Sequence, residues 1–308
     1  MDFVKENKLG SSSHPADWFE AFLPKRQSRH GYFSIEQCTQ WTNFKAQAMC
    51  NAGEGGLTYK YFTPFKVDET MKFFGLFLLN GLAPSPTLEA KFKCQADDPV
   101  FGNDLVHRTF GTNAERRLKM FKNFLSSCEP TIIPPDKEKY PNHKVEPFLK
   151  HAMQVSKKAV ILGRNLSVDE QTMGFQGKHG DKMRISYKNE GDGFQCDAIC
   201  SKGYTYTFYF RNQTPPKKYL DMGLSDTHSR VMGMIDQLPH KNYTLTMDNL
   251  YTSAKLARVA FLSLKKVMIN GVVRLDRRGV PDIVKQTEVS NKDKVAKVRN
   301  TLKVAMLK

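Results

Sequence analysis

The feature that most constrains this chain is a change in the spacing of its apolar residues near Leu162. Before that point apolar residues recur every three or four positions, which predicts amphipathic helices, most clearly over residues 67–79 and 114–125. After it, apolar residues alternate with polar ones or form short aromatic and β-branched runs, which is typical of strands. The chain is therefore expected to fold as a helical region followed by an α/β region.

The second region is predicted to contain, in order, three strands, a helix, a strand, a helix and a strand. This order suits a ribonuclease-H-like α/β fold, in which a mixed sheet carries acidic residues at its strand ends. We expect a poorly ordered lead-in (1–31), an all-helical domain (32–160) and the α/β domain (161–308). The expected strands are 166–171, 194–199, 204–210, 243–248 and 267–273, with an alternating segment at 183–188 and helices at about 225–238 and from about 253.

Charge narrows the choice of partner. The chain has 47 Lys and Arg residues against 31 Asp and Glu residues, a formal net charge of +16. Such an excess of positive charge indicates the kind of partner that the protein binds rather than its fold. Nucleic acid is the leading expectation, with an anionic membrane surface or a highly acidic protein as the alternatives. The chain has no apolar run of about eighteen residues, a charged start, and cysteines without a Cys-x-x-Cys pair. We therefore expect an intracellular protein without a membrane-spanning helix.

Two aspartates stand at strand ends. Asp169 ends the first expected strand of the α/β region, and Asp248 ends the fourth. These strands are neighbours in a ribonuclease-H-like sheet, so the two carboxylates would face each other. Their oxygens suit Mg²⁺ or Mn²⁺, and two such ions about 3.5–4 Å apart can hold the attacking and leaving oxygens of a phosphodiester. An alternative stays open, because an Asp between a strand and a helix is usually a turn or capping residue.

The segments around these acids carry a resemblance to a known family. Residues 167–175, SVDEQTMGF, resemble the segment that holds the first catalytic Asp of piggyBac-type transposases. Residues 246–253, TMDNLYTS, resemble the segment that holds the second, although Leu250 stands where an aromatic residue is usual. The resemblance runs from about residue 33 to the end, with further similar stretches at 271–281 and, more loosely, at 63–75.

This resemblance implies a DDE/D transposase catalytic domain on a ribonuclease-H-like fold, preceded by a helical domain for DNA binding or dimerisation. Asp169 and Asp248 would be the first two ligands of a two-metal Mg²⁺ or Mn²⁺ site. Such enzymes nick double-stranded DNA at transposon ends with metal-activated water, pass through hairpin ends, and insert at TTAA targets by strand transfer. The resemblance implies a nuclear protein, and assembly as a homodimer is left open.

The third acid of the family comes beyond a further strand, and here the chain ends at Lys308 inside what looks like that strand. Asp197 lies among apolar strand residues and is a remote substitute. We therefore expect an α/β domain that is incomplete at its C-terminus, binds DNA and does not transpose. Two alternatives stay open: an active transposase whose remaining C-terminus is missing from this sequence, and a domesticated protein that keeps the fold to bind chromatin partners.

Basic residues near the acids are candidate contacts to DNA phosphates. Such contacts supply affinity but little sequence information. A solvated basic surface explains any one of them equally well, but a set beside a DNA-cutting fold favours phosphate binding. Arg116 and Arg117 on the preceding helical region admit both interpretations. The predicted nucleic-acid-binding residues are Lys178, Lys182, Arg184, Lys188, Arg274, Arg277 and Arg278.

Overall fold

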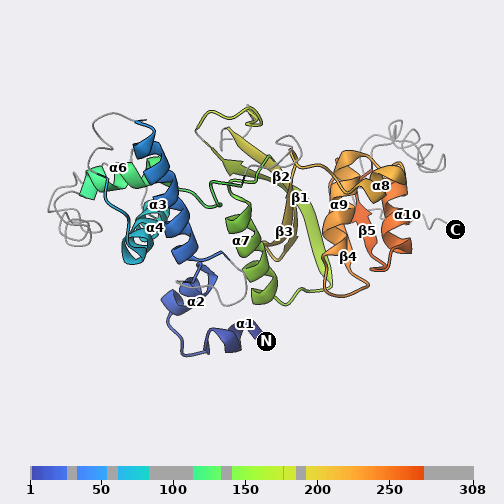
Figure 1. Cartoon of the computed structure of the whole chain (residues 1–308). Coiled ribbons are helices and arrows are strands. Elements are labelled where there is room, and N and C mark those ends of the chain that lie inside the picture. Colours follow the sequence, from blue (N-terminus) through green and yellow to red (C-terminus); the bar gives the residue numbers. More distant parts are fainter. Residues whose placement is uncertain are drawn as a thin grey trace, which may run out of the picture. The chain divides into compact units, whose positions relative to one another are not determined.

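The computed structural model describes residues 2–25, 33–53, 62–82, 114–132, 141–175, 177–184 and 192–273. The chain forms two compact units, Met1–Val155 and Ser156–Lys308, and each is considered by itself (Figure 1). Among the described residues, no helix is both long and apolar enough to cross a bilayer.

The first unit is built from helices around a core rich in phenylalanine. The rings of Phe73 and Phe121 stack with centroids 4.5 Å apart, and Phe65 and Phe124 are also buried in this core. Ser34 starts the longest described helix with a capping box, because its side chain accepts from the Gln37 backbone while the Gln37 side chain accepts from the Ser34 backbone. The described helices are α1 (Asp2–Glu6), α2 (Pro15–Phe22), α3 (Ile35–Asn51), α4 (Val67–Leu82), α6 (Ala114–Phe124) and α7 (Glu146–Ala159), the last of which runs into the second unit.

The lead-in, expected to be poorly ordered, contains two of these helices, α1 and α2. Phe3 is buried, and its ring lies 5.2 Å from that of Phe22. These aromatic contacts between short helices are non-local, so the polar and proline-containing sequence around them does not reveal them.

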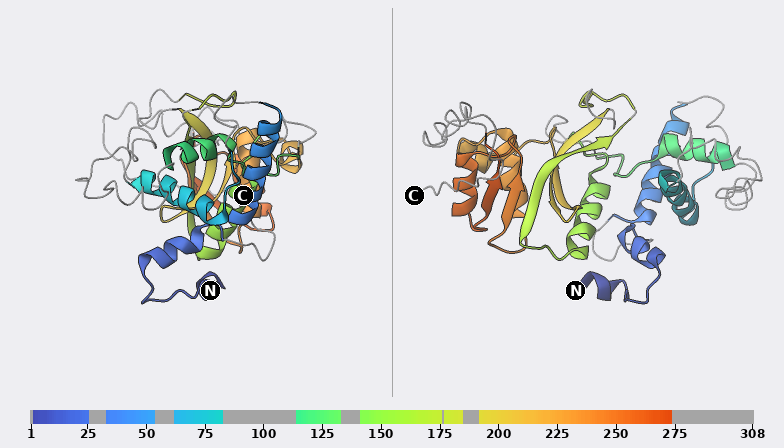
Figure 2. Two further views of the ribbon diagram at one scale, coloured as in Figure 1. Left: turned by 60° about the vertical axis from the view of Figure 1, so that its left-hand side comes forward. Right: turned by 180° about the vertical axis from the view of Figure 1, so that it is seen from behind.

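The second unit contains a five-stranded mixed sheet in the order β3-β2-β1-β4-β5. Strand β1 pairs antiparallel with β2 and parallel with β4, so the predicted neighbourhood of the first and fourth strands is confirmed. Seen from behind, β1 and β2 form a long twisted ribbon that extends beyond the short β4 (Figure 2). The strands are β1 (Asn165–Gly174), β2 (Gly193–Ser201), β3 (Tyr204–Phe210), β4 (Thr244–Met247) and β5 (Met268–Gly271).

Three described helices accompany this sheet: α8 (Lys217–Asp221), α9 (Asp226–Asp236) and α10 (Ala254–Leu262). Helices α9 and α10 begin close to the predicted positions, and the side chains of Ser225 and Ser253 cap them by accepting hydrogen bonds from backbone N–H groups. Helix α8 was not expected. Helix α9 packs on β2 and β3, and α10 packs on β5 and α9. Of the alternating segment 183–188, Met183 forms a bridge with Gly193, and residues 185–188 lie outside the described residues.

The core of this unit lies between the sheet and these helices. Leu166 and Val168 of β1 and Leu245 and Met247 of β4 are all buried in it. Because side chains alternate across a strand, the residues between them point to the opposite face of the sheet. That second face carries the predicted acids.

Candidate functional site

The pairing of β1 with β4 brings the two predicted acids together. Val168 pairs with Met247 in the parallel ladder, and Asp169 and Asp248 are the next residue on each strand path. Val168 and Met247 are buried, whereas both aspartates are exposed, so both belong to the face away from the core. Asp169 and Asp248, which are far apart in the sequence, therefore lie side by side at the end of β4.

The turn that follows β4 fixes the backbone of Asp248. Asp248 Oδ1 accepts a hydrogen bond of 2.8 Å from the Leu250 N–H. The Thr252 N–H and hydroxyl both donate to the Asp248 carbonyl, at 3.1 and 2.7 Å. Asp248 is thus a turn residue as well as a candidate ligand, and one role does not exclude the other because an ionised carboxylate accepts about four hydrogen bonds or metal contacts.

Gly271 at the end of β5 is required by this turn. A Cβ at that position would lie 2.2 Å from the Met247 carbonyl oxygen and 2.4 Å from Thr252 Oγ1, both closer than atoms can approach. The backbone of β5 therefore packs directly against the 248–252 turn. A glycine inside a strand pattern is the sequence signal for such a close approach.

A buried ion-pair network connects the strands to the same turn. Asp197 of β2 is fully buried, with Oδ1 contacting Nε and Nη2 of Arg211 at 3.0 and 2.9 Å. Its Oδ2 accepts from Nε of Arg230, on α9, at 2.9 Å. The Tyr251 hydroxyl in the turn donates to Asp197 Oδ1 at 2.8 Å. Asp197 is therefore fully engaged and is unavailable as the substitute metal ligand that the sequence left open.

Glu170 joins this network from β1. Its Oε1 accepts from Arg211 Nη2 at 2.7 Å, and it lies opposite Asp197 in the β1–β2 ladder. Two carboxylates thus balance two guanidinium groups. Burial alone would lower the pKa of Arg211, but the neighbouring Glu170 and Asp197 more than offset it and hold that pKa above its usual range. Burial, reinforced by Asp197, raises the pKa of the Tyr251 hydroxyl, which therefore stays protonated.

The network anchors both segments that carry the candidate ligands. Glu170 directly follows Asp169, and Asp169 Oδ1 accepts from the Glu170 N–H at 2.7 Å. Tyr251 lies three residues after Asp248 in the 248–252 turn. Sequence reasoning missed these supports, since the only local signal was an ionisable residue, Asp197, inside an apolar strand.

The side chains of Asp169 and Asp248 suit the binding of a divalent cation. Two exposed carboxylates, Asp169 in the middle of β1 and Asp248 just after the end of β4, offer the oxygen donors that Mg²⁺ and Mn²⁺ prefer. Within the part of the chain that the structure describes, no cluster of three or more His, Cys, Asp or Glu side chains is placed to hold a metal. The described residues therefore contribute two carboxylates to the site, Asp169 and Asp248.

The predicted basic residues have different surroundings. Lys178 and Arg184 are exposed in the loop after β1, whereas Lys182 forms an ion pair of 3.1 Å with Asp192. In the first unit, Arg117 binds Glu69 through two hydrogen bonds of 2.5 and 3.0 Å, which makes it a structural residue of that unit. The remaining predicted contacts, which lie outside the described residues, are Lys188, Arg274, Arg277 and Arg278.

Comparison with known proteins identifies a family and a similar fold. A family model described as Transposase IS4 matches residues 14–308. The fold is similar to a solved structure, the cryo-EM piggyBac transposase synaptic complex with hairpin DNA, with a TM-score of 0.64 and 21% sequence identity. The match covers 83% of this chain and 52% of that one, so this chain spans about half the length of the protein it resembles.

Proposed function

This chain belongs to the Transposase IS4 family, of piggyBac type, and we propose that it binds double-stranded DNA and holds a divalent cation between Asp169 and Asp248. The observation that carries the proposal is the parallel pairing of β1 with β4, which ends with the two acids adjacent. The solved relative is a complex with hairpin DNA, and this chain shares its fold.

The chain's own residues have separate tasks in this proposal. Asp169 and Asp248 hold the cation, Mg²⁺ or Mn²⁺, which when bound would neutralise phosphate charge and activate water. The network around Asp197 holds β1 next to Asp169, through Glu170, and the turn after Asp248, through Tyr251. Exposed Lys178 and Arg184 contact DNA phosphates, as does the set of basic residues outside the described part of the chain.

DNA cleavage and strand transfer are the reactions that the family performs, and they are considered separately from DNA binding. The two-metal reaction of the family uses a third carboxylate, and the described residues contribute two, so we expect Asp169 and Asp248 by themselves to bind a cation without supporting DNA nicking. Transposon ends as ligand, TTAA as target and the nucleus as location belong to the same proposal, and membership of the family supports them. Assembly as a homodimer stays open.

The first test is Mn²⁺ binding to the full chain, followed by electron paramagnetic resonance. Replacing Asp169 or Asp248 by Asn should weaken Mn²⁺ binding at least about tenfold, because each change removes a charged oxygen ligand. Asp221→Asn is the matched control, an exposed aspartate at the end of α8. Equal Mn²⁺ affinity in all four proteins would refute the cation site.

DNA binding and nicking are measured on the same proteins. We expect salt-sensitive binding of a duplex in fluorescence anisotropy and no relaxation of a supercoiled plasmid in Mn²⁺. Plasmid nicking that disappears in Asp169→Asn would instead establish the active-transposase alternative. Salt-insensitive or absent DNA binding would refute the proposal that the protein binds DNA.

A further inference from the structure

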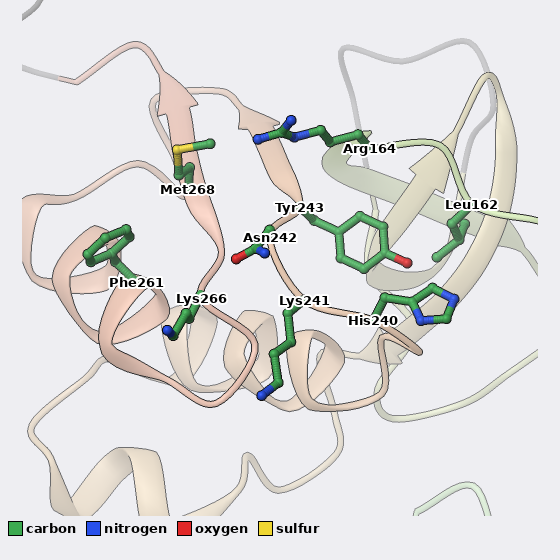
Figure 3. Close-up of a pocket in the computed structure, with 9 residues that line it drawn as sticks. All are labelled: Leu162, Arg164, His240, Lys241, Asn242, Tyr243, Phe261, Lys266 and Met268. Atoms are coloured by element: carbon green, nitrogen blue, oxygen red, sulfur yellow. The ribbon is translucent and has the colours of Figure 1, made fainter.

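A basic pocket lies at the opposite end of the strands that carry the acids. It has a volume of about 540 Å³ and opens where three parallel strands begin: Arg164 precedes β1, Asn242 precedes β4 and Lys266 precedes β5 (Figure 3). The residues that line it are Leu162, Arg164, His240, Lys241, Asn242, Tyr243, Phe261, Lys266 and Met268.

The described lining of this pocket is basic. Among the residues that the structure describes, the lining contains Arg164, Lys241 and Lys266 and no acidic residue. Within the described ranges, none of these three side chains forms an ion pair, in contrast to Lys182, Arg211 and other cations that do. Unpaired like charges around one cavity repel each other, so an anion that enters the pocket gains from all of them.

Two residues that line the pocket, one of them the cation Lys266, have a left-handed backbone conformation. Asn242 and Lys266 both have positive φ, 63° and 49°, and for a lysine this left-handed conformation costs on the order of 1 kcal/mol or more. The two loops are tied together, because the Asn242 N–H donates to the Lys265 carbonyl at 2.8 Å. Strain retained at pocket-lining residues is typical of binding sites, where it positions a side chain before the ligand arrives.

The pocket and the acids are joined by an open face of the sheet. Ser167 pairs with Thr246 between the two ends, and both side chains are exposed. Central parallel strands are normally covered on both faces, whereas α9 and α10, two described helices that contact this sheet, share the buried core on its other face. We call the surface formed by Ser167, Asp169, Thr246 and Asp248 the open face. Its hydroxyl groups are of the kind that contact DNA backbones.

We propose that the basic pocket is a phosphate-binding site and that its ligand is the sugar–phosphate backbone of DNA lying along the open face; the choice of DNA rests on the proposed function above. Figure 3 shows Arg164 on one side of the pocket, with Lys241 and Lys266 on the other. Cations on two sides suit a ligand with several phosphates better than a single ion. From Arg164 to Asp169 is five residues of β-strand, about 16 Å, which is less than half a helical turn of DNA.

The test compares two double variants of the full chain that remove the same charge. Lys241→Gln with Lys266→Gln changes the pocket, whereas Lys202→Gln with Lys217→Gln changes exposed lysines elsewhere in the same unit. Duplex binding is followed by anisotropy over a salt titration. Loss of two phosphate contacts should reduce the slope of log K against log salt by about 1.8, and the control should keep the wild-type slope. Arg164→Gln, with an expected loss of about 0.9, is the second variant in case the double change impairs folding.

A second arm distinguishes the source of the phosphate. Inorganic pyrophosphate is added to wild type and to both double variants, and thermal unfolding is measured. A pocket-dependent salt slope supports the whole proposal. An unchanged slope with pocket-dependent stabilisation by pyrophosphate keeps the phosphate site and overturns DNA as its ligand. If the pocket and control variants behave alike in both the DNA-binding and the pyrophosphate experiments, the proposal of a phosphate-binding pocket is wrong. If the wild-type protein shows no salt-sensitive DNA binding, the proposed DNA-binding function is itself refuted.

Discussion

The replacement of Asp197 by Asn is the sharpest test of how this fold is held together. Asn keeps the shape of the side chain but removes the charge that faces Arg211 and Arg230. Arg211 keeps its ion pair with Glu170, whereas Arg230, only 6% exposed, loses its sole carboxylate among the described residues. Removing one partner of a buried ion pair costs about 3–5 kcal/mol, because the other charge stays buried without compensation.

That loss is large against the total stability of a domain, which is of the order of 5–15 kcal/mol. For a unit of this size about 2–4 °C are lost per kcal/mol, so the melting temperature should fall by about 6–20 °C. The assay is thermal and urea unfolding of the full chain by circular dichroism, with hydrogen exchange to confirm that the α/β unit is the part affected.

Glu170→Gln is the matched control. Glu170 makes a single ion pair with Arg211, and its side chain is 22% exposed, so this change should cost about 1 kcal/mol or less. If Asp197→Asn melts no lower than Glu170→Gln, the network does not stabilise the sheet. The two acids at its edge would then depend on some other support.

Three further predictions concern single residues. Gly271→Ala should cost about 1–3 kcal/mol in urea unfolding and weaken Mn²⁺ binding, because its Cβ collides with the turn after β4; unchanged values would contradict that contact. Burial lowers the pKa of His151 from 6.5, so the unfolded chain binds the extra proton and stability should fall as pH drops below 6.5; His151→Gln should abolish this dependence, and a variant that keeps it would exclude His151 as the cause. Burial raises the pKa of Cys38 and Cys196 to about 12, so iodoacetamide should modify the partly exposed Cys50 and Cys128 before these two thiols in the native protein, and early modification of either buried thiol would contradict the packing.

Much of the fold could be predicted because it depends on local rules. Apolar spacing separates the helical region from the strands, and polar residues near 225 and 253 indicate where α9 and α10 start, where the structure shows Ser225 and Ser253 as the caps. The turn at Lys202 and Gly203 has the positive φ angles that a glycine-containing hairpin turn needs. Helix α8 was missed because it is a five-residue helix with no side-chain cap and too short for a periodic pattern.

The sequence by itself predicted a strand that contains Asp169 and a strand that ends just before Asp248, because short strands and the turn after β4 are readable from a few neighbouring residues; the expectation that Asp169 ends its strand was wrong, because β1 continues to Gly174 through its pairing with β2. Only the tertiary structure decided which acidic side chains face solvent and which are buried in ion pairs. Asp197 sits in a strand like Asp169, but its partners Arg211 and Arg230 come 14 and 33 residues later. The basic pocket likewise collects residues from the beginnings of three strands. Strand periodicity sets the face that a side chain takes, whereas its partners depend on which distant segments pack beside it, and no local pattern records that choice.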